Sequence, residues 1–411
     1  MVRLRRVLCR VGGVRRTLTL PSRLMIIVAM GTFFCVQPAL AQQQSVGGAL
    51  SSLLLAQDTP YPIAEKDIAA ATATRDTLGQ LLLVELSTLP TTTSSAGFVY
   101  RFNSSLGTFE RASTQFGPFF AERALRAGRN QASLGLAYRY ADFTSLQGAS
   151  LTDGNFPANA SRTAGSTVPY QVDELAVRLH TKTVTAYGSY GITDRLDVGA
   201  TVPIVSLNFI GTRVSQTQGQ SSLQSSVFSN ASGLGDVALT ARYALALEGS
   251  KGFAVGTDLR LPTGDSANLL GAGSTAARFL AIGSFEGSHA ATHVNLGYTV
   301  GGASRELTYE AALTVAADAR LTLVGELLGR RIADLHTLDP VYAPHVTVPG
   351  IETMRWLPEG DSVRQALLVT GVKWNVGRSY MLNANLLFRL TDAGLTARVV
   401  PSVTLDYTFQ R

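Results

Sequence analysis

The histidines are the first residues to test for chemistry, because the chain has only five of them: His180, His289, His293, His336 and His345. On a strand, the four-residue step from His289 to His293 spans about 13 Å at 3.3 Å per residue, too far for one metal ion. Ser288 precedes His289, but neighbouring side chains of a regular strand point to opposite faces, so a nucleophile–base pair is not expected. We therefore predict no metal site, no cofactor and no enzymatic activity.

Eight charged residues alternate with apolar ones in segments of period two, and these are the candidate site residues. If such segments form a barrel wall, charges opposite the apolar face line its lumen. They either pair across strands and rigidify the wall, or line a conduit and set its selectivity. The candidates are Arg242, Asp258, Arg260, Glu310, Glu326, Arg389, Arg398 and Asp406.

The last stretch of the chain gives the clearest view of the elements that must position these charges. Its apolar positions are Val403, Leu405, Tyr407 and Phe409, and polar residues stand between them. Strict alternation predicts a strand with one apolar and one polar face. The stretch resembles the closing strand of bacterial outer-membrane barrels, which implies that it is the signal read by the barrel-assembly machinery. Here two further residues follow the terminal Phe.

Eleven earlier segments show similar alternation, and with the last they have the length of tilted membrane strands. Long and short connections alternate between them, as in a barrel with short periplasmic turns and long outer loops. We therefore predict an all-β chain, a transmembrane antiparallel up-and-down β-barrel of about 12 strands (alternative 14). A soluble sandwich or solenoid is the competing fold. Pro203 and Pro401 are expected at strand ends or bulges. The predicted strands are 130–144, 175–191, 195–209, 236–247, 252–261, 277–286, 291–300, 307–316, 320–329, 365–375, 379–390 and 397–409. The predicted long loops are 145–174, 210–235, 262–276 and 330–364.

The N-terminal end of the chain predicts export. Residues 1–41 combine seven arginines, a short apolar core and an A-x-A site at Ala39–Ala41, as a cleaved signal peptide does. The alternative, an N-terminal membrane anchor, needs a longer apolar core. The leader holds both cysteines and seven of the 35 basic residues, so 28 basic and 29 acidic residues follow it. This balance and the loss of the thiols argue against nucleic-acid binding, disulfides and thiolate metal sites.

Between the leader and the barrel lies a segment of different composition. We assign 42–128 as an N-terminal periplasmic or plug-like segment and 129–411 as the barrel. Residues 42–97 are either a lead-in or a plug that enters the lumen. The aromatic-rich residues 98–128 are expected to form one more hairpin or a cap.

Several short runs together resemble a known family. Read locally, Gly235-Asp236 starts a strand and Gly264-Asp265 belongs to a turn. As a set, the runs are similar to the outer-membrane barrel family named for the meta pathway of phenol degradation, whose architecture is like that of long-chain fatty-acid transporters. The resemblance implies a transporter-like barrel for aromatic or other hydrophobic compounds. The residues that carry it are Gly233, Gly235, Asp236, Pro262, Thr263, Gly264 and Asp265, with Asn295–Tyr298 and Tyr190–Gly199.

The sequence therefore predicts a protein of the Gram-negative outer membrane, in contact with its lipid. The first functional hypothesis is a channel for passive uptake of small hydrophobic or aromatic compounds. The alternative is a structural or surface-interaction barrel with a closed lumen and partner-binding outer loops. A third hypothesis, a lipid hydrolase, depends on Ser288 and His289.

Overall fold

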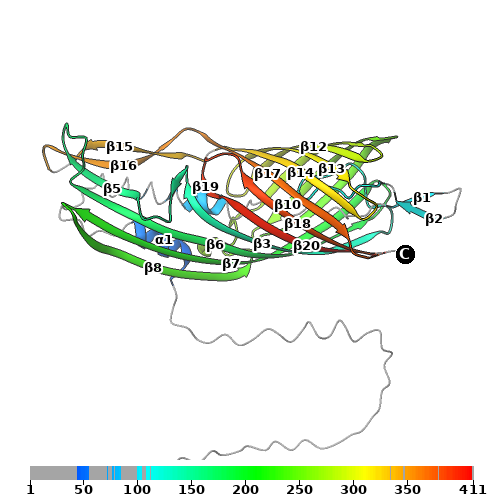
Figure 1. Cartoon of the computed structure of the whole chain (residues 1–411), viewed down its shortest axis with the longest axis horizontal. Helices are drawn as coiled ribbons and strands as arrows, with labels where there is room; N and C mark the ends of the chain where they lie inside the picture. The colour runs from blue at the N-terminus through cyan, green and yellow to red at the C-terminus, as the bar shows by residue number, and fades with distance from the viewer. Residues whose placement is uncertain are drawn as a thin grey trace, which may run out of the picture. The chain divides into compact units, whose positions relative to one another are not determined.

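The computed structural model describes most of the chain after the predicted leader (Figure 1). The leader itself and its cleavage site lie outside the described residues. Among the helices described, none has the length and apolarity needed to span a membrane. The described residues are 44–54, 72, 76–77, 79–84, 100–103, 108–111, 113–333, 335–345, 348–377 and 379–409.

Twelve antiparallel strands of the described chain close into a barrel, which confirms the predicted fold class and strand number. The ring closes where the last strand pairs with the first, Val403 opposite Tyr138. Each of the twelve predicted segments overlaps one of these strands. They are β3 (Ala132–Leu146), β6 (Gln171–Gly191), β7 (Leu196–Thr217), β9 (Val237–Glu248), β10 (Lys251–Leu261), β11 (Ala276–Glu286), β12 (Ala290–Gly301), β13 (Glu306–Ala316), β14 (Leu321–Ala333), β17 (Ser362–Asn375), β18 (Tyr380–Arg389) and β20 (Val399–Phe409).

The faces of the strands point as the alternation predicts. In β20, Val403, Leu405 and Phe409 are exposed, whereas Thr404 and Thr408 are buried inside. In a closed sheet every ladder bond is made within the wall, so the outer surface can be apolar throughout. The outside of the barrel is such an apolar band, whereas the inside is polar along strands such as β20 and apolar where α1 (Val46–Leu54) packs against the wall.

We expect an arginine in place of Leu296 to destabilise the barrel by roughly 2–4 kcal/mol, the cost of a charge facing lipid at mid-depth. Leu296 lies in the middle of β12, with 54% of its surface exposed on the outer face. Urea unfolding in lipid vesicles measures the change. The control is Leu223→Arg in β8 (Gln220–Leu234), which lies outside the twelve-strand ring. If both variants lost the same unfolding free energy, Leu296 would be no more exposed to lipid than Leu223.

Three of the four predicted long loops contain strands, which corrects the sequence-based assignment, whereas 262–276 is a loop apart from one 3-10 turn. Residues 210–217 continue β7 and pair with β8, although the composition of β8 is rich in Ser and Gln. Polar composition indicates exposure, and an exposed strand can still form a ladder with its neighbour. The other added elements are β4 (Ala149–Ser150), β5 (Phe156–Thr163), β15 (Thr337–Pro344), β16 (Ile351–Glu359), β19 (Leu395–Ala397) and the 3-10 turn η2 (Ser266–Asn268).

Both prolines lie within strands, where the ladder on one side is interrupted. β7 pairs with β9 as far as Thr201 and with β8 from Ile204 onward, and Pro203 falls between. β20 pairs with β3 only from Ser402, directly after Pro401. A residue without an N–H is tolerated at such a break. The prediction of strand ends or bulges is therefore wrong for Pro203, which lies inside β7, whereas Pro401 lies two residues from the start of β20.

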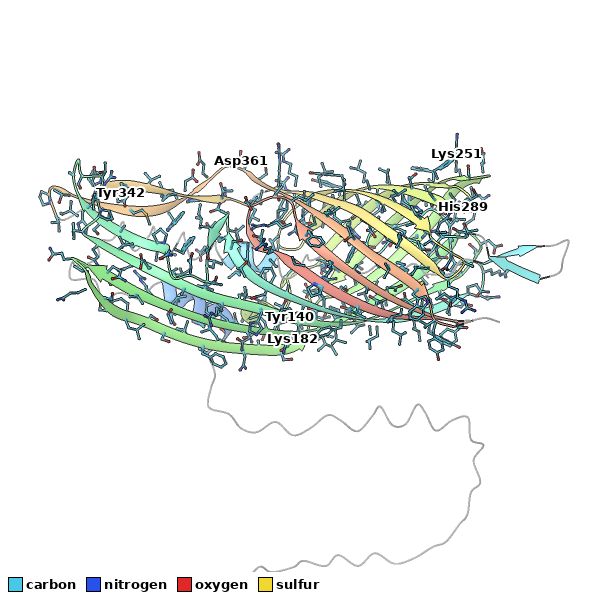
Figure 2. The ribbon with its side chains drawn as sticks, in the orientation of Figure 1. Tyr140, Lys182, Lys251, His289, Tyr342 and Asp361 are labelled. Carbon is cyan, nitrogen blue, oxygen red and sulfur yellow. The ribbon has the colours of Figure 1, made fainter. Side chains whose placement is uncertain are left out.

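The barrel has two different ends. At one end lie the short turns and the last residues of β20, with Lys251 and His289 (Figure 2). We call this the short-turn end. At the opposite long-loop end lie β15, β16 and Tyr342 (Figure 2). The expected hairpin in 98–128 is present as β1 (Tyr100–Asn103) and β2 (Thr108–Arg111), a separate two-stranded sheet.

Candidate functional site in the lumen

Residues 113–128, here called the lumen segment, run through the interior of the barrel near the short-turn end. At its start, Thr114 Oγ1 donates a hydrogen bond to Ser288 O (2.6 Å), in the turn between β11 and β12. At its end, Ala127 N donates to the Asp197 carboxylate of β7 (3.1 Å). The segment therefore joins two separate places on the wall and crosses the lumen between them.

One wall carboxylate holds the middle of the lumen segment. Glu326 of β14 accepts the backbone N–H groups of Phe119, Phe120 and Ala121, the last two at 3.0 Å. Lys373 Nζ of β17 donates to Pro118 O at 2.7 Å. Glu326 is only 1% exposed. A buried carboxylate is tolerated when such donors replace water, so Glu326 acts as an anchor for the segment.

A row of alternating charges runs across the wall from the lumen segment. Glu122 pairs with Arg242 of β9 (3.1 Å), and Arg242 pairs with Asp258 of β10 (2.5 Å). Arg278 of β11 continues the row, 2.7 Å from Asp258 and 3.5 Å from Glu310 of β13. We call these five residues the charged row. Its members pair across strands, which is the rigidifying arrangement, and they also face a cavity.

The remaining candidates take different places. Arg260 lines the cavity beside the charged row. Arg389 donates to Ser145 Oγ at 2.6 Å and pairs with Asp392. The Asp406 carboxylate accepts hydrogen bonds from Tyr187 and Asn383 inside the barrel. Arg398 is exposed in the one-residue break between β19 and β20, and its place in the lumen stays a prediction.

Sequence reasoning missed several lumen residues. Arg278 lies in a predicted strand, where alternation places it opposite Phe279, so the signal was present. The sequence carries no comparable signal for Glu122 or Lys373. Glu122 belongs to no strand, and the importance of Lys373 depends on a partner, Pro118, that is 255 positions away.

Four of the cavities among the described residues bear on the lumen, and three of these share lining residues. The charged cavity, of about 120 Å³, is lined by the charged row. It shares Arg330, Gln365 and Leu367 with a middle cavity of about 40 Å³. The middle cavity shares Leu395 with the helix cavity, also about 40 Å³, whose lining is wholly apolar and includes leucines of α1 (Val46–Leu54). The three form a series from an apolar to a charged environment.

The fourth cavity lies on the other side of the lumen segment. This turn-end pocket, of about 290 Å³, is lined by Ser113, Leu125 and residues of the short turns. Phe120 and Glu122 of the same segment line the charged cavity instead. The lumen segment is therefore the partition between the series of three cavities and the short-turn end.

Five of the residues that suggested a family, Gly235, Asp236, Thr263, Gly264 and Asp265, belong to one hydrogen-bonded cluster. Asp236 accepts from Gly264 N (3.0 Å) and Ala272 N (2.7 Å). Thr263 Oγ1 donates to Gly235 O and accepts from Val237 N. Asp265 caps η2, where Asn268 accepts from Val46 N at the start of α1. Pro262 is exposed directly after β10, and Gly233 lies beside Leu270. What looked like a separate strand start and turn is thus one structure that positions α1.

Gly271 tests this cluster. We expect Gly271→Ala to destabilise the barrel by about 1–3 kcal/mol, as for overpacking. Its Cβ would lie 2.2 Å from Asp236 Oδ1 and 2.7 Å from Gly264 Cα. Heat-modifiable migration and urea unfolding measure the loss. The control is Gly325→Ala, where a Cβ has no neighbour within 4 Å. A stable Gly271→Ala barrel would show that the cluster is dispensable.

The histidines do not form a catalytic or metal centre in the described chain. His289 and Ser288 are both exposed in the turn before β12, and their hydrogen bonds do not join them. His293 is buried, and its Nδ1 lies 2.9 Å from Ser284 Oγ, which also accepts Ala124 N of the lumen segment. Among the described residues no group of three or more His, Cys, Asp or Glu is arranged to hold a metal ion.

Comparison with known proteins gives one family and several similar structures. Residues 153–332 match the family described as "Putative MetA-pathway of phenol degradation", a range that runs from β5 to β14 and includes both halves of the Asp236 cluster. No curated protein matches the sequence. An outer-membrane channel from Pseudomonas putida F1 is 13% identical, with a TM-score of 0.43, over 70% of this chain and 98% of that one.

Two further solved structures are similar at lower scores. The KdgM porin, solved in complex with disordered oligogalacturonate, is 8% identical with a TM-score of 0.33, over 67% of this chain and 99% of that one. The CymD monoaromatic hydrocarbon channel is 9% identical with a TM-score of 0.28, over 69% and 90%.

Proposed function

We infer that this chain belongs to the family of the putative MetA pathway of phenol degradation, which its residues 153–332 match, and is an outer-membrane channel for passive uptake of small hydrophobic or aromatic compounds. The lumen segment closes the channel at rest. The short-turn end faces the periplasm and the long-loop end faces outward, as in other membrane barrels. In this proposal the barrel-assembly machinery reads Val403 to Phe409.

The series of cavities is the observation that carries the proposal. The helix cavity offers an entirely apolar lining near the long-loop end. The charged cavity, two steps further in, offers arginines and carboxylates. An aromatic compound with a polar substituent has a surface for each: its ring leaves water in the first, and its polar group finds hydrogen bonds in the second.

Closure by the lumen segment fits the same pathway. The segment separates the charged cavity from the turn-end pocket, which opens toward the short-turn end in this proposal. Its anchors are hydrogen bonds and ion pairs to the wall, such as those of Glu326 and Arg242. A solute that reaches the charged row competes for these groups, so passage requires the segment to move.

Planar-bilayer recordings and vesicle uptake of labelled aromatic compounds test the proposal. The mature chain is compared with a chain that lacks residues 42–97 and with variants of the anchors. We expect low conductance in the intact protein and saturable uptake of aromatic solutes. Equal uptake by protein-containing and empty vesicles, across aromatic compounds and fatty acids, would overturn the proposed transport.

A second candidate function is a structural or surface-interaction barrel. The observation that favours it is the filled interior: α1 and Leu81 pack in an apolar core toward the long-loop end, and the lumen segment lies at the other. The β15–β16 hairpin, with Arg162 of β5 stacked on Tyr342, is then the partner-binding surface. Deleting residues 335–359 separates the two functions, because adhesion would be lost while uptake stays unchanged.

A further inference from the structure

Two arginines face each other on the outer surface of the barrel. Arg331 of β14 and Arg364 of β17 are direct cross-strand partners, and both side chains are exposed. Arg331 Nε donates to Ser362 Oγ at 3.2 Å. Among the ion pairs of the described residues, none includes either arginine. Like charges directly opposite on a sheet are destabilising, so an anion bound between the two guanidinium groups would stabilise the pair.

The arginine pair lies at the edge of the apolar band that is nearer the long-loop end. Leu323 and Leu327, which precede Arg331 in β14, also point outward. Arg331 is ten residues beyond Leu321, the first residue of β14. At 3.3 Å per residue and a tilt of about 40°, this step rises roughly 25 Å, which is the height of the apolar band of such barrels. The pair is therefore at the level of lipid headgroups.

Apolar side chains flank the pair on both sides. Leu307 of β13 is the cross-strand partner of Arg331 and is 39% exposed. Leu390 is 53% exposed, and its N–H donates to Ala366 O, two residues from Arg364. A free phosphate ion makes no apolar contact with these leucines, whereas the part of a lipid acyl chain next to the headgroup can pack against them.

We propose that Arg331 and Arg364 bind the phosphate of a lipid headgroup in the outer leaflet. Guanidinium groups bind phosphate oxygens through paired, charge-assisted hydrogen bonds. The phosphate cancels the repulsion between the two arginines, and Leu307 and Leu390 contact the start of the acyl chains. The proposal rests on the placement of the barrel in the membrane, and it holds whether or not the lumen conducts.

Native mass spectrometry of the refolded mature chain, titrated with phosphatidic acid, tests the proposal. We expect Arg331→Gln/Arg364→Gln to bind this lipid roughly 30-fold more weakly, the factor given by two interfacial arginines at about 1 kcal/mol each. The matched control, Arg195→Gln/Arg320→Gln, removes two exposed charges from short turns at the other end. If Arg331→Gln/Arg364→Gln bound phosphatidic acid as tightly as the parent does, the proposed site would be wrong.

Two further measurements distinguish a bound lipid from free phosphate and from a packing role of the arginines. Inorganic phosphate should displace phosphatidic acid only at a large excess; displacement at equal concentration would assign the site to free phosphate. In vesicles of an uncharged glycolipid, which has no phosphate, the Arg331→Gln/Arg364→Gln variant should be as stable as the parent or more so, because repulsion is removed. With phosphatidic acid added, the order should reverse. A variant that is less stable in both lipids would show a packing role instead.

Discussion

Replacing Glu326 by alanine is expected to open the channel. The substitution removes the acceptor of three backbone N–H groups in the lumen segment, at Phe119 to Ala121. A hydrogen bond to a charged group contributes about 1.5–3 kcal/mol, so the loss of even one shifts the closed-to-open equilibrium by about tenfold to more than a hundredfold. Single-channel recording measures the change as longer and more frequent openings.

The matched control for this experiment is Glu248→Ala, which removes an exposed carboxylate from the end of β9. Its conductance should equal that of the parent. Glu326→Gln is expected to lie between parent and alanine, because the amide oxygen still accepts, though without a charge. Conductance that is unchanged in Glu326→Ala, with the barrel folded, would mean that the lumen segment does not control passage.

Replacing Arg242 by methionine is expected to cost about 3–5 kcal/mol of unfolding free energy, the range for removing one partner of a buried ion pair. Arg242 is 3% exposed and pairs with both Glu122 and Asp258. Asp258 keeps Arg278, but Glu122 loses the partner described for it. Urea unfolding in vesicles, with heat-modifiable migration as the folding criterion, measures the loss.

A double-mutant cycle shows whether the lost pair is the cause. Arg242→Met/Glu122→Gln should recover part of the stability, since a neutral amide costs less to bury than an uncompensated carboxylate. Arg320→Met, in an exposed turn, should change stability little. If the double variant is no more stable than Arg242→Met, the effect comes from packing of the arginine on Gly256, whose missing Cβ would lie 2.5 Å from Arg242 Cδ.

The charged row has a consequence for selectivity. Its charges alternate in sign from Glu122 to Glu310, so the charged cavity has no large excess of either sign. A lumen of one sign favours ions of the other. We therefore expect weak anion–cation selectivity in the open channel and a preference for neutral polar groups on the solute.

The wall of the barrel was determined by the sequence alone. Strand alternation has a period of two residues, so the order of Val403 to Phe409 is enough to assign which side chains face lipid. The same local pattern predicted the twelve strands and the direction of Asp258, Glu310 and Asp406. The prolines followed only in part, because Pro401 lies near the start of β20 but the break between two ladders that accommodates Pro203 inside β7 was not predicted.

The interior was decided by the tertiary structure. Glu326 and the N–H groups that it holds are more than 200 residues apart, and no spacing rule relates them. Asp236 and Gly264 were each read correctly as local features, yet only the pairing of β9 with β10 brings them within hydrogen-bond distance. Three of the four long connections were misread for a related reason: strands such as the Ser-rich β8 lack an apolar face, and they form by pairing with a neighbouring strand. The face of the sheet on which a side chain lies is a local property of the backbone. The group to which that side chain hydrogen-bonds depends on how the whole sheet closes.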